Sequence, residues 1–214
     1  MQFAIFRLRR KIIADFPQRA IHKTVTHKLR KQQSSVIKTN KLNLMKDNKN
    51  YPKSFSHIGI TVPNINEAVK FYSEVMGWYI IMEPSKVKKE KETAIGQMCI
   101  DVFGNDWNEF EIAHLATSDG IGIELFCFPN GIKEAPEFNP FNTGLFHFCV
   151  QDPNIEELIE KIVSYGGKQR MPIREYYPNE KPFKMCYVED PFGIVFEIYT
   201  HSYELTYSSG AYTK

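Results

Sequence analysis

Phe55-Ser56-His57-Ile58-Gly59-Ile60, followed by Pro63-Asn64-Ile65-Asn66-Glu67, returns ninety residues later as Leu145-Phe146-His147-Phe148-Cys149-Val150, followed by Pro153-Asn154-Ile155-Glu156-Glu157. Each copy runs from a short apolar segment with one histidine into the Asn-x-x-Glu pattern that is typical of a helix start. The repetition predicts an internal duplication, in which the chain contains two copies of one strand-helix unit.

The first copy continues into further elements. Apolar spacing and turn residues predict strands at 55–62, 78–82, 109–117 and 121–128, and a helix at 65–76. Segment 93–103 is compatible with a strand or a helix, and its apolar spacing favours a helix that Gly104 ends. The charged segment 86–92 is interpreted as a solvated loop. The predicted order is β-α-β-(α)-β-β.

The second copy follows a connector at 129–143 that is rich in Pro, Gly and Asn. Strands are predicted at 145–150, 168–172, 184–189 and 194–200, with one helix over 155–163. The fold class is therefore α+β. We expect a basic leader without a compact fold at 1–50, a first βαβββ module at 51–135 and a second at 143–205, which together form one domain over 51–205.

The charge is unevenly distributed along the chain. Of the 27 basic and 25 acidic residues, 13 and 2 lie in residues 1–50, so the rest of the chain carries 14 and 23. An acidic fold is unsuited to phosphate backbones, which argues against nucleic acid as a partner. No apolar run is long enough to cross a membrane, so no membrane association is expected.

The leader has an acid-poor, arginine-bearing, amphipathic start, which is typical of an organelle transit peptide. Translation that starts at Met45 explains this segment equally well. The expected compartment is the cytoplasm, or the mitochondrion if the leader is a genuine transit peptide. Cysteines without close spacing predict free thiols rather than disulfides or a zinc-thiolate site; they are Cys99, Cys127, Cys149 and Cys186.

Each half also ends in a strand with one carboxylate, Glu124 in the first and Glu197 in the second. Because alternate side chains of a strand share a face, these glutamates, with His57 and His147, can all point away from the helix-covered side. Two carboxylates alone in a shared trough would repel each other, and a divalent cation resolves that conflict. Two imidazoles and two carboxylates suit Ni, Zn, Co, Mn or Fe, so the sequence predicts one divalent metal ion at this site.

Simpler interpretations apply to the other polar residues. Asn64/Glu67 and Asn154/Glu157 are interpreted as helix caps, and His114 as a core or pocket residue. Candidates to receive an acidic substrate, each more often a surface charge, are Lys70, Arg170, Arg174 and Lys184. Tyr176 and Tyr177 are candidates to cover a pocket.

The same stretches resemble the vicinal-oxygen-chelate superfamily, which includes glyoxalase I, methylmalonyl-CoA epimerase, extradiol dioxygenases, fosfomycin-resistance enzymes and bleomycin-binding proteins. The matching segments are Phe55–Trp78, Ile121–Phe128, Leu145–Gly167 and Tyr187–Tyr199, the last with Val188-Glu189-Asp190-Pro191-Phe192-Gly193. The resemblance covers about residues 54–202 and implies two βαβββ modules in a paired half-barrel. His57, Glu124, His147 and Glu197 fall on the family's ligand positions, and this set is similar to that of bacterial glyoxalase I.

The resemblance implies a metal-dependent lyase or isomerase of the glyoxalase I type, which acts through a metal-bound enediolate on a small α-oxygenated carbonyl compound. Glu197 is the expected base, and internal symmetry leaves Glu124 as a second candidate. Glyoxalase I carries a glutathione-binding Arg where this chain has Glu67, which argues against glutathione as co-substrate.

Other functions remain open from the sequence. The enzyme alternatives are an acyl-CoA or hydroxy-acid epimerase and an extradiol dioxygenase. The alternative outside enzymes is a metal-free small-molecule-binding protein of the bleomycin-resistance type. The flexible composition of the connector allows the two modules to close within one chain or to swap across a homodimer.

Overall fold

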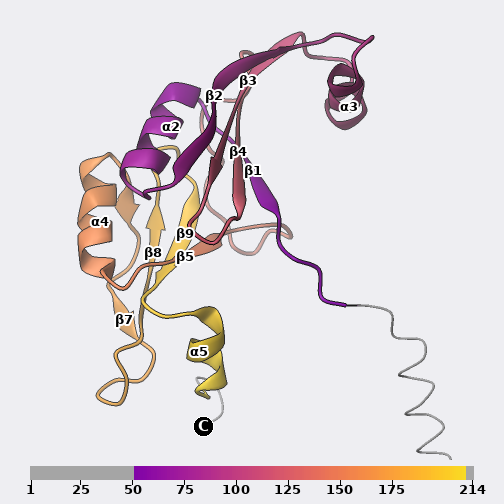
Figure 1. Cartoon of the computed structure of the whole chain (residues 1–214). Coiled ribbons are helices and arrows are strands. Elements are labelled where there is room, and N and C mark those ends of the chain that lie inside the picture. The colour runs from indigo at the N-terminus through magenta and orange to yellow at the C-terminus, as the bar shows by residue number, and fades with distance from the viewer. Residues whose placement is uncertain (1–50, 211–214) are drawn as a thin grey trace, which may run out of the picture. The chain divides into compact units, whose positions relative to one another are not determined.

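The structure is a computed structural model that describes residues 51–210. The chain divides into two units, Met1–Ser54 and Phe55–Lys214, and the second unit carries the sheets and helices discussed below (Figure 1). The predicted leader at 1–50 lies outside the described residues.

The first sheet has the strand order β1-β4-β3-β2. Its strands are β1 (His57–Thr61), β2 (Tyr79–Lys88), β3 (Glu109–Ala116) and β4 (Gly122–Cys127). β1 and β4 run parallel, and a parallel pair needs a crossover, which α2 (Ile65–Glu74) begins. The side chain of Asn64 caps α2 by accepting from the backbone N–H groups of Asn66 and Glu67, as its sequence position predicts.

The second sheet repeats this plan with the order β5-β9-β8-β6, and β7 also pairs with β8. Its strands are β5 (Phe148–Gln151), β6 (Lys168–Gln169), β7 (Arg174–Glu175), β8 (Lys184–Glu189) and β9 (Val195–Tyr199). α4 (Ile155–Ser164) follows β5, and β5 and β9 run parallel. The predicted α+β class with two βαβββ modules is confirmed.

Several predicted local features are wrong. β2 continues through Lys88, because its last residues pair with β3, so the start of the charged segment 86–92 is a strand and not a loop. β5 begins only at Phe148, which leaves His147 just before the strand. Asn154 makes no side-chain capping bond; its own N–H instead donates to the carboxylate of Asp152. β7 and the last helix, α5 (Tyr203–Ser208), were not predicted.

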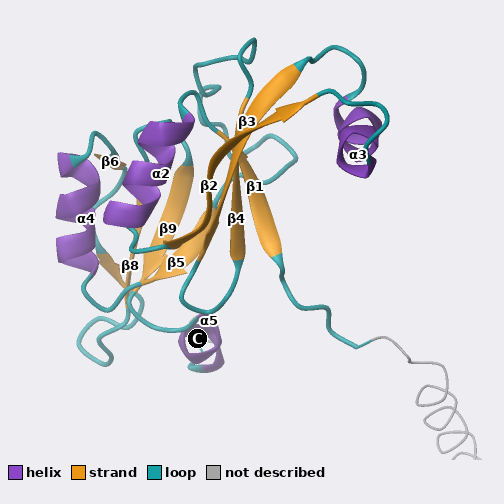
Figure 2. Ribbon diagram, turned by 45° about the horizontal axis from the view of Figure 1, so that its top comes forward, coloured by secondary structure: helices purple, strands orange, loops and turns teal. Residues whose placement is uncertain are grey.

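One continuous apolar core joins the two modules. α2 and α4 lie side by side, and the Tyr165 hydroxyl after α4 donates to Glu74 at the end of α2 at 2.7 Å (Figures 1 and 2). Trp78 stacks on Tyr72 with ring centroids 5.0 Å apart and also contacts Phe148 of the second sheet. The modules therefore pack through their helix-covered faces, which leaves the opposite face of each sheet outside this core.

The Tyr72 hydroxyl makes the main buried polar contact between the modules. It donates to Oδ2 of Asp190 at 2.6 Å, and Oδ1 of Asp190 accepts from the backbone N–H groups of Phe192 and Ile194. Each carboxylate oxygen thus has a donor, which compensates for its burial. This contact fixes α2 of the first module against the β8–β9 turn of the second.

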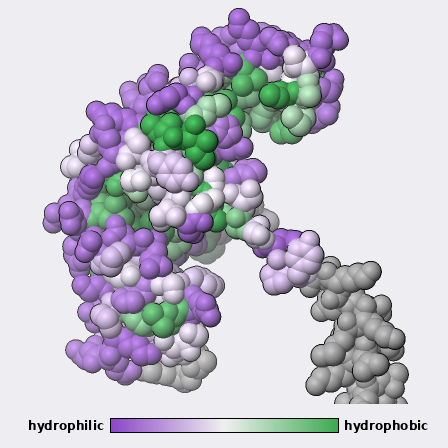
Figure 3. All heavy atoms as spheres, in the orientation of Figure 1, coloured by the Kyte–Doolittle hydropathy of each residue, from purple (hydrophilic) through white to green (hydrophobic). Residues whose placement is uncertain are grey.

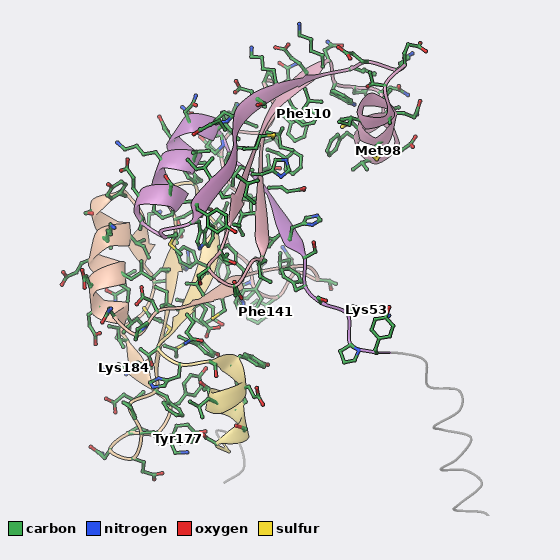
Figure 4. The ribbon with its side chains drawn as sticks, in the orientation of Figure 1. Lys53, Met98, Phe110, Phe141, Tyr177 and Lys184 are labelled. Atoms are coloured by element: carbon green, nitrogen blue, oxygen red, sulfur yellow. The ribbon has the colours of Figure 1, made fainter. Side chains whose placement is uncertain are left out.

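α3 (Ala94–Phe103) is held mainly at its C-terminal end. Phe103 makes edge-to-face contacts with an aromatic cluster of β3, β4 and their flanks, namely Trp107, Phe110, Phe126 and Phe128. Ile95, Met98 and Val102 are exposed on α3 and contribute to its apolar surface (Figures 3 and 4). Because Phe126 shares a strand face with Glu124, α3 is anchored on the side of the sheet that carries this glutamate.

Candidate metal centre

In the first module, Glu124 lies between two imidazoles. Its Oε2 is 3.7 Å from Nε2 of His57, and its Oε1 is 3.8 Å from Nδ1 of His114. His114 is directly opposite Glu124 in the β3–β4 register. The side chains of His57 and Glu124 are 54% and 28% exposed, so this first half-site (His57, His114 and Glu124) is open to solvent.

In the second module, Glu197 lies beside His147, with 3.4 Å between Oε2 and Nε2. Tyr187 is opposite Glu197 in the β8–β9 register, the place that His114 takes in the first module. The His147 ring packs edge-to-face on Tyr187 with centroids 5.2 Å apart. The side chains of His147 and Glu197 are 25% and 7% exposed, so this second half-site (His147, Tyr187 and Glu197) is less open to solvent than the first.

Burial sets the electrostatics of the second half-site. Burial raises the pKa of Glu197, and hydrogen bonding from Tyr199 and Tyr187 partly offsets this effect. Burial lowers the pKa of His147, so its imidazole is neutral at neutral pH and available as a ligand. Burial and then the charge of Glu197 raise the pKa of Tyr187 to about 12. Glu197 is thus a carboxylate surrounded by neutral groups.

The two His–Glu pairs fit a divalent cation. Separations of 3.7 and 3.4 Å are long for a charge-assisted hydrogen bond. They are close to the roughly 3 to 3.5 Å expected between two donors that share one cation at about 2.0–2.2 Å each. In His147 the nitrogen that faces the carboxylate, and would bind the cation, is Nε2. Two nitrogen and two carboxylate donors also match the preferences of Zn, Ni, Co, Mn and Fe.

The four predicted ligands do not converge within one chain. In the part of the chain that the structure describes, no group of three or more His, Cys, Asp or Glu side chains is arranged to hold a metal ion. The structure brings His57 together with Glu124 and His147 together with Glu197, but it keeps these pairs apart. One chain therefore presents two half-sites.

The other predicted residues have varied surroundings. Lys184 donates to Glu156 at 2.6 Å, and Arg170 is bonded to Glu189 and lies over the Phe138 ring, so both cations already have partners. Tyr177 is buried beside α5 and donates to the carbonyl of Thr206 (Figure 4). The cysteines of the described residues are free, as predicted.

Sequence reasoning missed the role of Tyr187 and underestimated that of His114. Both lie on the strand before a glutamate strand, at the position that faces the glutamate in the antiparallel register. The antiparallel register across each hairpin turn, counted back from Glu124 and Glu197, would have identified His114 and Tyr187. His114 is about one third exposed, which agrees with a pocket position.

Comparison with known proteins identifies the family. The model of the Glyoxalase/Bleomycin resistance protein/Dioxygenase superfamily matches residues 54–198, and the chain belongs to this family. A glyoxalase family protein from Bacillus cereus is similar in structure, with a TM-score of 0.56 and 21% identity over 71% of this chain and 96% of its own. This likeness shows the fold.

Two further structures are more distant. Glyoxalase I from Zea mays has a TM-score of 0.49 and 20% identity over 71% of this chain and 46% of its own. A glyoxalase family protein from Enterococcus faecalis has a TM-score of 0.47 and 20% identity over 69% of this chain and 97% of its own. A comparison with curated protein sequences gives no match. In the described residues, no helix has the length and apolarity needed to cross a membrane.

Proposed function

We propose that this protein is a divalent-metal-dependent lyase or isomerase of the glyoxalase I type, whose site forms between two copies of the chain. The observation that carries the proposal is the pair of equivalent His–Glu half-sites on sheet faces outside the shared core. His57 and Glu124 of one copy, with His147 and Glu197 of the other, would complete the four-ligand set. The second copy is needed because one chain holds no such set among residues 51–210.

The packing of the modules supports this assembly. Their helix-covered faces are already joined through Tyr72, Trp78 and Asp190, so they cannot also close on each other through the opposite faces. β1 and β5 are edge strands of the two sheets, with open backbone groups on one side. The exposed apolar residues of α3 lie on the side of the first sheet that carries Glu124. A second copy that packs on this side would bury them.

A bound dication would polarise the carbonyl of an α-oxygenated substrate. Glu197 would take a proton from the carbon next to that carbonyl and return it to the neighbouring carbon. Its Oε2 lies 3.4 Å from Nε2 of His147, which places the carboxylate next to the proposed metal, where it can serve as a proton shuttle. His147, held neutral by burial, stays a ligand at neutral pH. The low exposure of the Glu197 side chain, 7%, also limits the access of water to the proton transfer.

Glutathione is not part of the proposal. Glu67, at the position where glyoxalase I carries its glutathione-binding Arg, is an exposed acid in the first turn of α2. A negative side chain there repels a carboxylate of the co-substrate. We therefore propose a small α-oxygenated carbonyl compound as substrate.

An extradiol dioxygenase is the second candidate. It requires two histidines and one glutamate, and His57, His147 and Glu197 provide that set. Loading the protein with Ni²⁺ or Co²⁺ and testing hemithioacetals, against Fe²⁺ with catechols and O₂, separates the two. Oxygen uptake without any isomerisation would favour the dioxygenase.

Mixing variants tests the assembly. His57→Ala and His147→Ala each remove one ligand from every site and should be inactive alone. Co-expressed in equal amounts with different tags, half of the dimers combine both chains, and each mixed dimer keeps one of its two sites intact. We expect about a quarter of wild-type activity from the mixture. No recovery, with mixed dimers present, would rule out a site shared between copies.

A further inference from the structure

Two aromatic rings pack against the imidazole of His147. The Phe146 ring lies edge-to-face on the His147 ring with centroids 4.2 Å apart, and the Tyr187 ring contacts it in the same way at 5.2 Å. The rings of Phe146 and Tyr187 also stack on each other, with an angle of 18° between their planes and 6.3 Å between their centroids. The imidazole is therefore part of a cluster of three mutually packed rings.

This packing takes a role that a hydrogen bond usually has. A metal-binding histidine typically donates from the ring nitrogen that does not bind the metal, and this bond fixes the orientation of the ring. In His147 that nitrogen is Nδ1, and within residues 51–210 it is buried without a hydrogen-bond partner. Strand pairing does not fix the residue either, because the β5–β9 ladder begins one residue later, with Phe148 opposite Phe196. The orientation of the His147 ring therefore depends on its aromatic neighbours.

Phe146 is held in turn by the connector at 129–143. The Phe138 ring contacts the Phe146 ring with centroids 5.8 Å apart. The guanidinium carbon of Arg170 lies 4.5 Å from the centre of the Phe138 ring. Arg170 is itself bonded to Glu189 at the end of β8, whose side chain is only 11% exposed. A chain of contacts thus runs from the second sheet through Phe138 to Phe146.

The connector also packs closely on the turn between β8 and β9. A Cβ atom at Gly193 would lie 2.6 Å from Cβ of Ala135, so the two backbones are in close contact there. Ala135 and Phe138 therefore attach the connector to the same module that carries His147.

We propose that Phe146 is a positioning residue, which holds the His147 imidazole in its metal-binding orientation, and that Phe138 of the connector keeps Phe146 in place. The inference rests on the proposed metal site. Phe146 lies outside the buried core cluster, and its side chain is 38% exposed. The Phe146 ring is therefore not needed to fill the core, and its contacts act on the half-site.

The first module supports the inference by contrast. In the sequence repeat, the residue before the histidine is Ser56 in the first copy and Phe146 in the second. His57 is already within β1, opposite Gly122 of β4, and its Nδ1 lies 3.3 Å from the hydroxyl oxygen of Ser56. Strand pairing and a hydroxyl are thus available to orient the first histidine, whereas aromatic rings orient the second.

Substitutions at Phe146 in the full chain test the inference. Phe146→Leu removes the ring but keeps an apolar side chain, and Phe146→Tyr keeps the ring. Phe141→Leu is the matched control, because Phe141 belongs to the same connector and is 94% exposed (Figure 4). Calorimetry measures Co²⁺ binding to the metal-free protein, and the visible spectrum of bound Co²⁺ reports the ligand geometry. Thermal unfolding and sedimentation show whether each variant keeps the fold and the oligomeric state of the wild type.

We expect Phe146→Leu to weaken Co²⁺ binding by about 3- to 10-fold, the effect of one aromatic contact, and to shift the Co²⁺ spectrum. Phe146→Tyr and Phe141→Leu should bind Co²⁺ like the wild type.

The inference is wrong, and the proposed function stands, if the wild type binds Co²⁺ and Phe146→Leu matches its affinity and spectrum. The same conclusion follows if Phe146→Tyr binds as weakly as Phe146→Leu, because the ring is then not what matters. A change of oligomeric state in Phe146→Leu would make Phe146 an interface residue and would also contradict the positioning role. If the wild type binds no Co²⁺, the metal site itself is wrong, and the inference with it.

Discussion

The two half-sites share a backbone plan and differ in their chemistry. On equivalent strands, Glu124 faces Gly59 and His114, whereas Glu197 faces Cys149 and Tyr187. The first glutamate is four times more exposed than the second, at 28% against 7% of the side chain. The two modules have therefore kept one His–Glu pair each while the surroundings of the pairs diverged, so that the first pair is more accessible to solvent than the second.

The largest expected effect is a loss of kcat, and it should differ between the two glutamates. Glu197→Gln removes the proposed base and should lower kcat by about 10²- to 10⁴-fold in the metal-loaded protein. Glu124→Gln removes only a ligand charge and should cost clearly less. Turnover of a substrate panel with matched Co²⁺ content measures both. Equal losses would mean that the two half-sites share the base function.

The Tyr72–Asp190 hydrogen bond between the modules should contribute strongly to stability. Tyr72→Phe removes the buried donor to Oδ2 of Asp190, and we expect the free energy of unfolding to fall by about 1–3 kcal/mol. Urea unfolding of the metal-free protein measures this loss. Tyr165→Phe, which removes the exposed hydroxyl bonded to Glu74, is the control and should cost less. If Tyr72→Phe leaves the free energy of unfolding unchanged, apolar packing alone joins the modules.

The burial of Glu197 predicts a pH dependence in the metal-free protein. Its folded pKa is raised, so the folded state binds this proton more tightly than the unfolded chain does. The associated stability is present below the unfolded pKa of about 4.3 and is lost as pH rises through the folded pKa.

Glu197→Gln removes this dependence, so metal-free Glu197→Gln should gain stability relative to the wild type as pH rises from about 4 to 7. Glu124→Gln, at the more exposed site, is the control. Urea unfolding at several pH values in the presence of a chelator measures the effect. If the difference in unfolding free energy between variant and wild type is the same at every pH, burial does not disfavour the charged form of Glu197.

The smallest effect concerns the cations of the second module. Lys184 is paired with Glu156 at the surface, with side chains 34% and 55% exposed. Lys184→Met should change stability by less than about 1 kcal/mol and leave KM unchanged. Steady-state kinetics with an acidic substrate checks the second point. A rise in KM would restore Lys184 as a substrate-binding residue.

Much of the fold could be read from the chain. The Asn64 cap, the helix after β1 and after β5, and the hairpins that lead to Glu124 and Glu197 all depend on local spacing. The predicted strand boundaries are wrong where pairing with a neighbouring strand overrides the local sequence preference. β2 keeps its charged end because β3 is there to pair with it, and β5 starts late because only residues from Phe148 find partners on β9.

The sequence by itself determined the duplication, the fold class and the presence of one His and one Glu in each half, because these features depend on local spacing. Only the tertiary structure decided which faces the modules use to pack, since this depends on contacts such as Tyr72–Asp190 between residues 118 apart. The same long-range packing places Tyr207 of α5 beside Tyr199 at the end of β9. Spacing along a chain cannot fix such contacts, because they depend on how whole elements fit together.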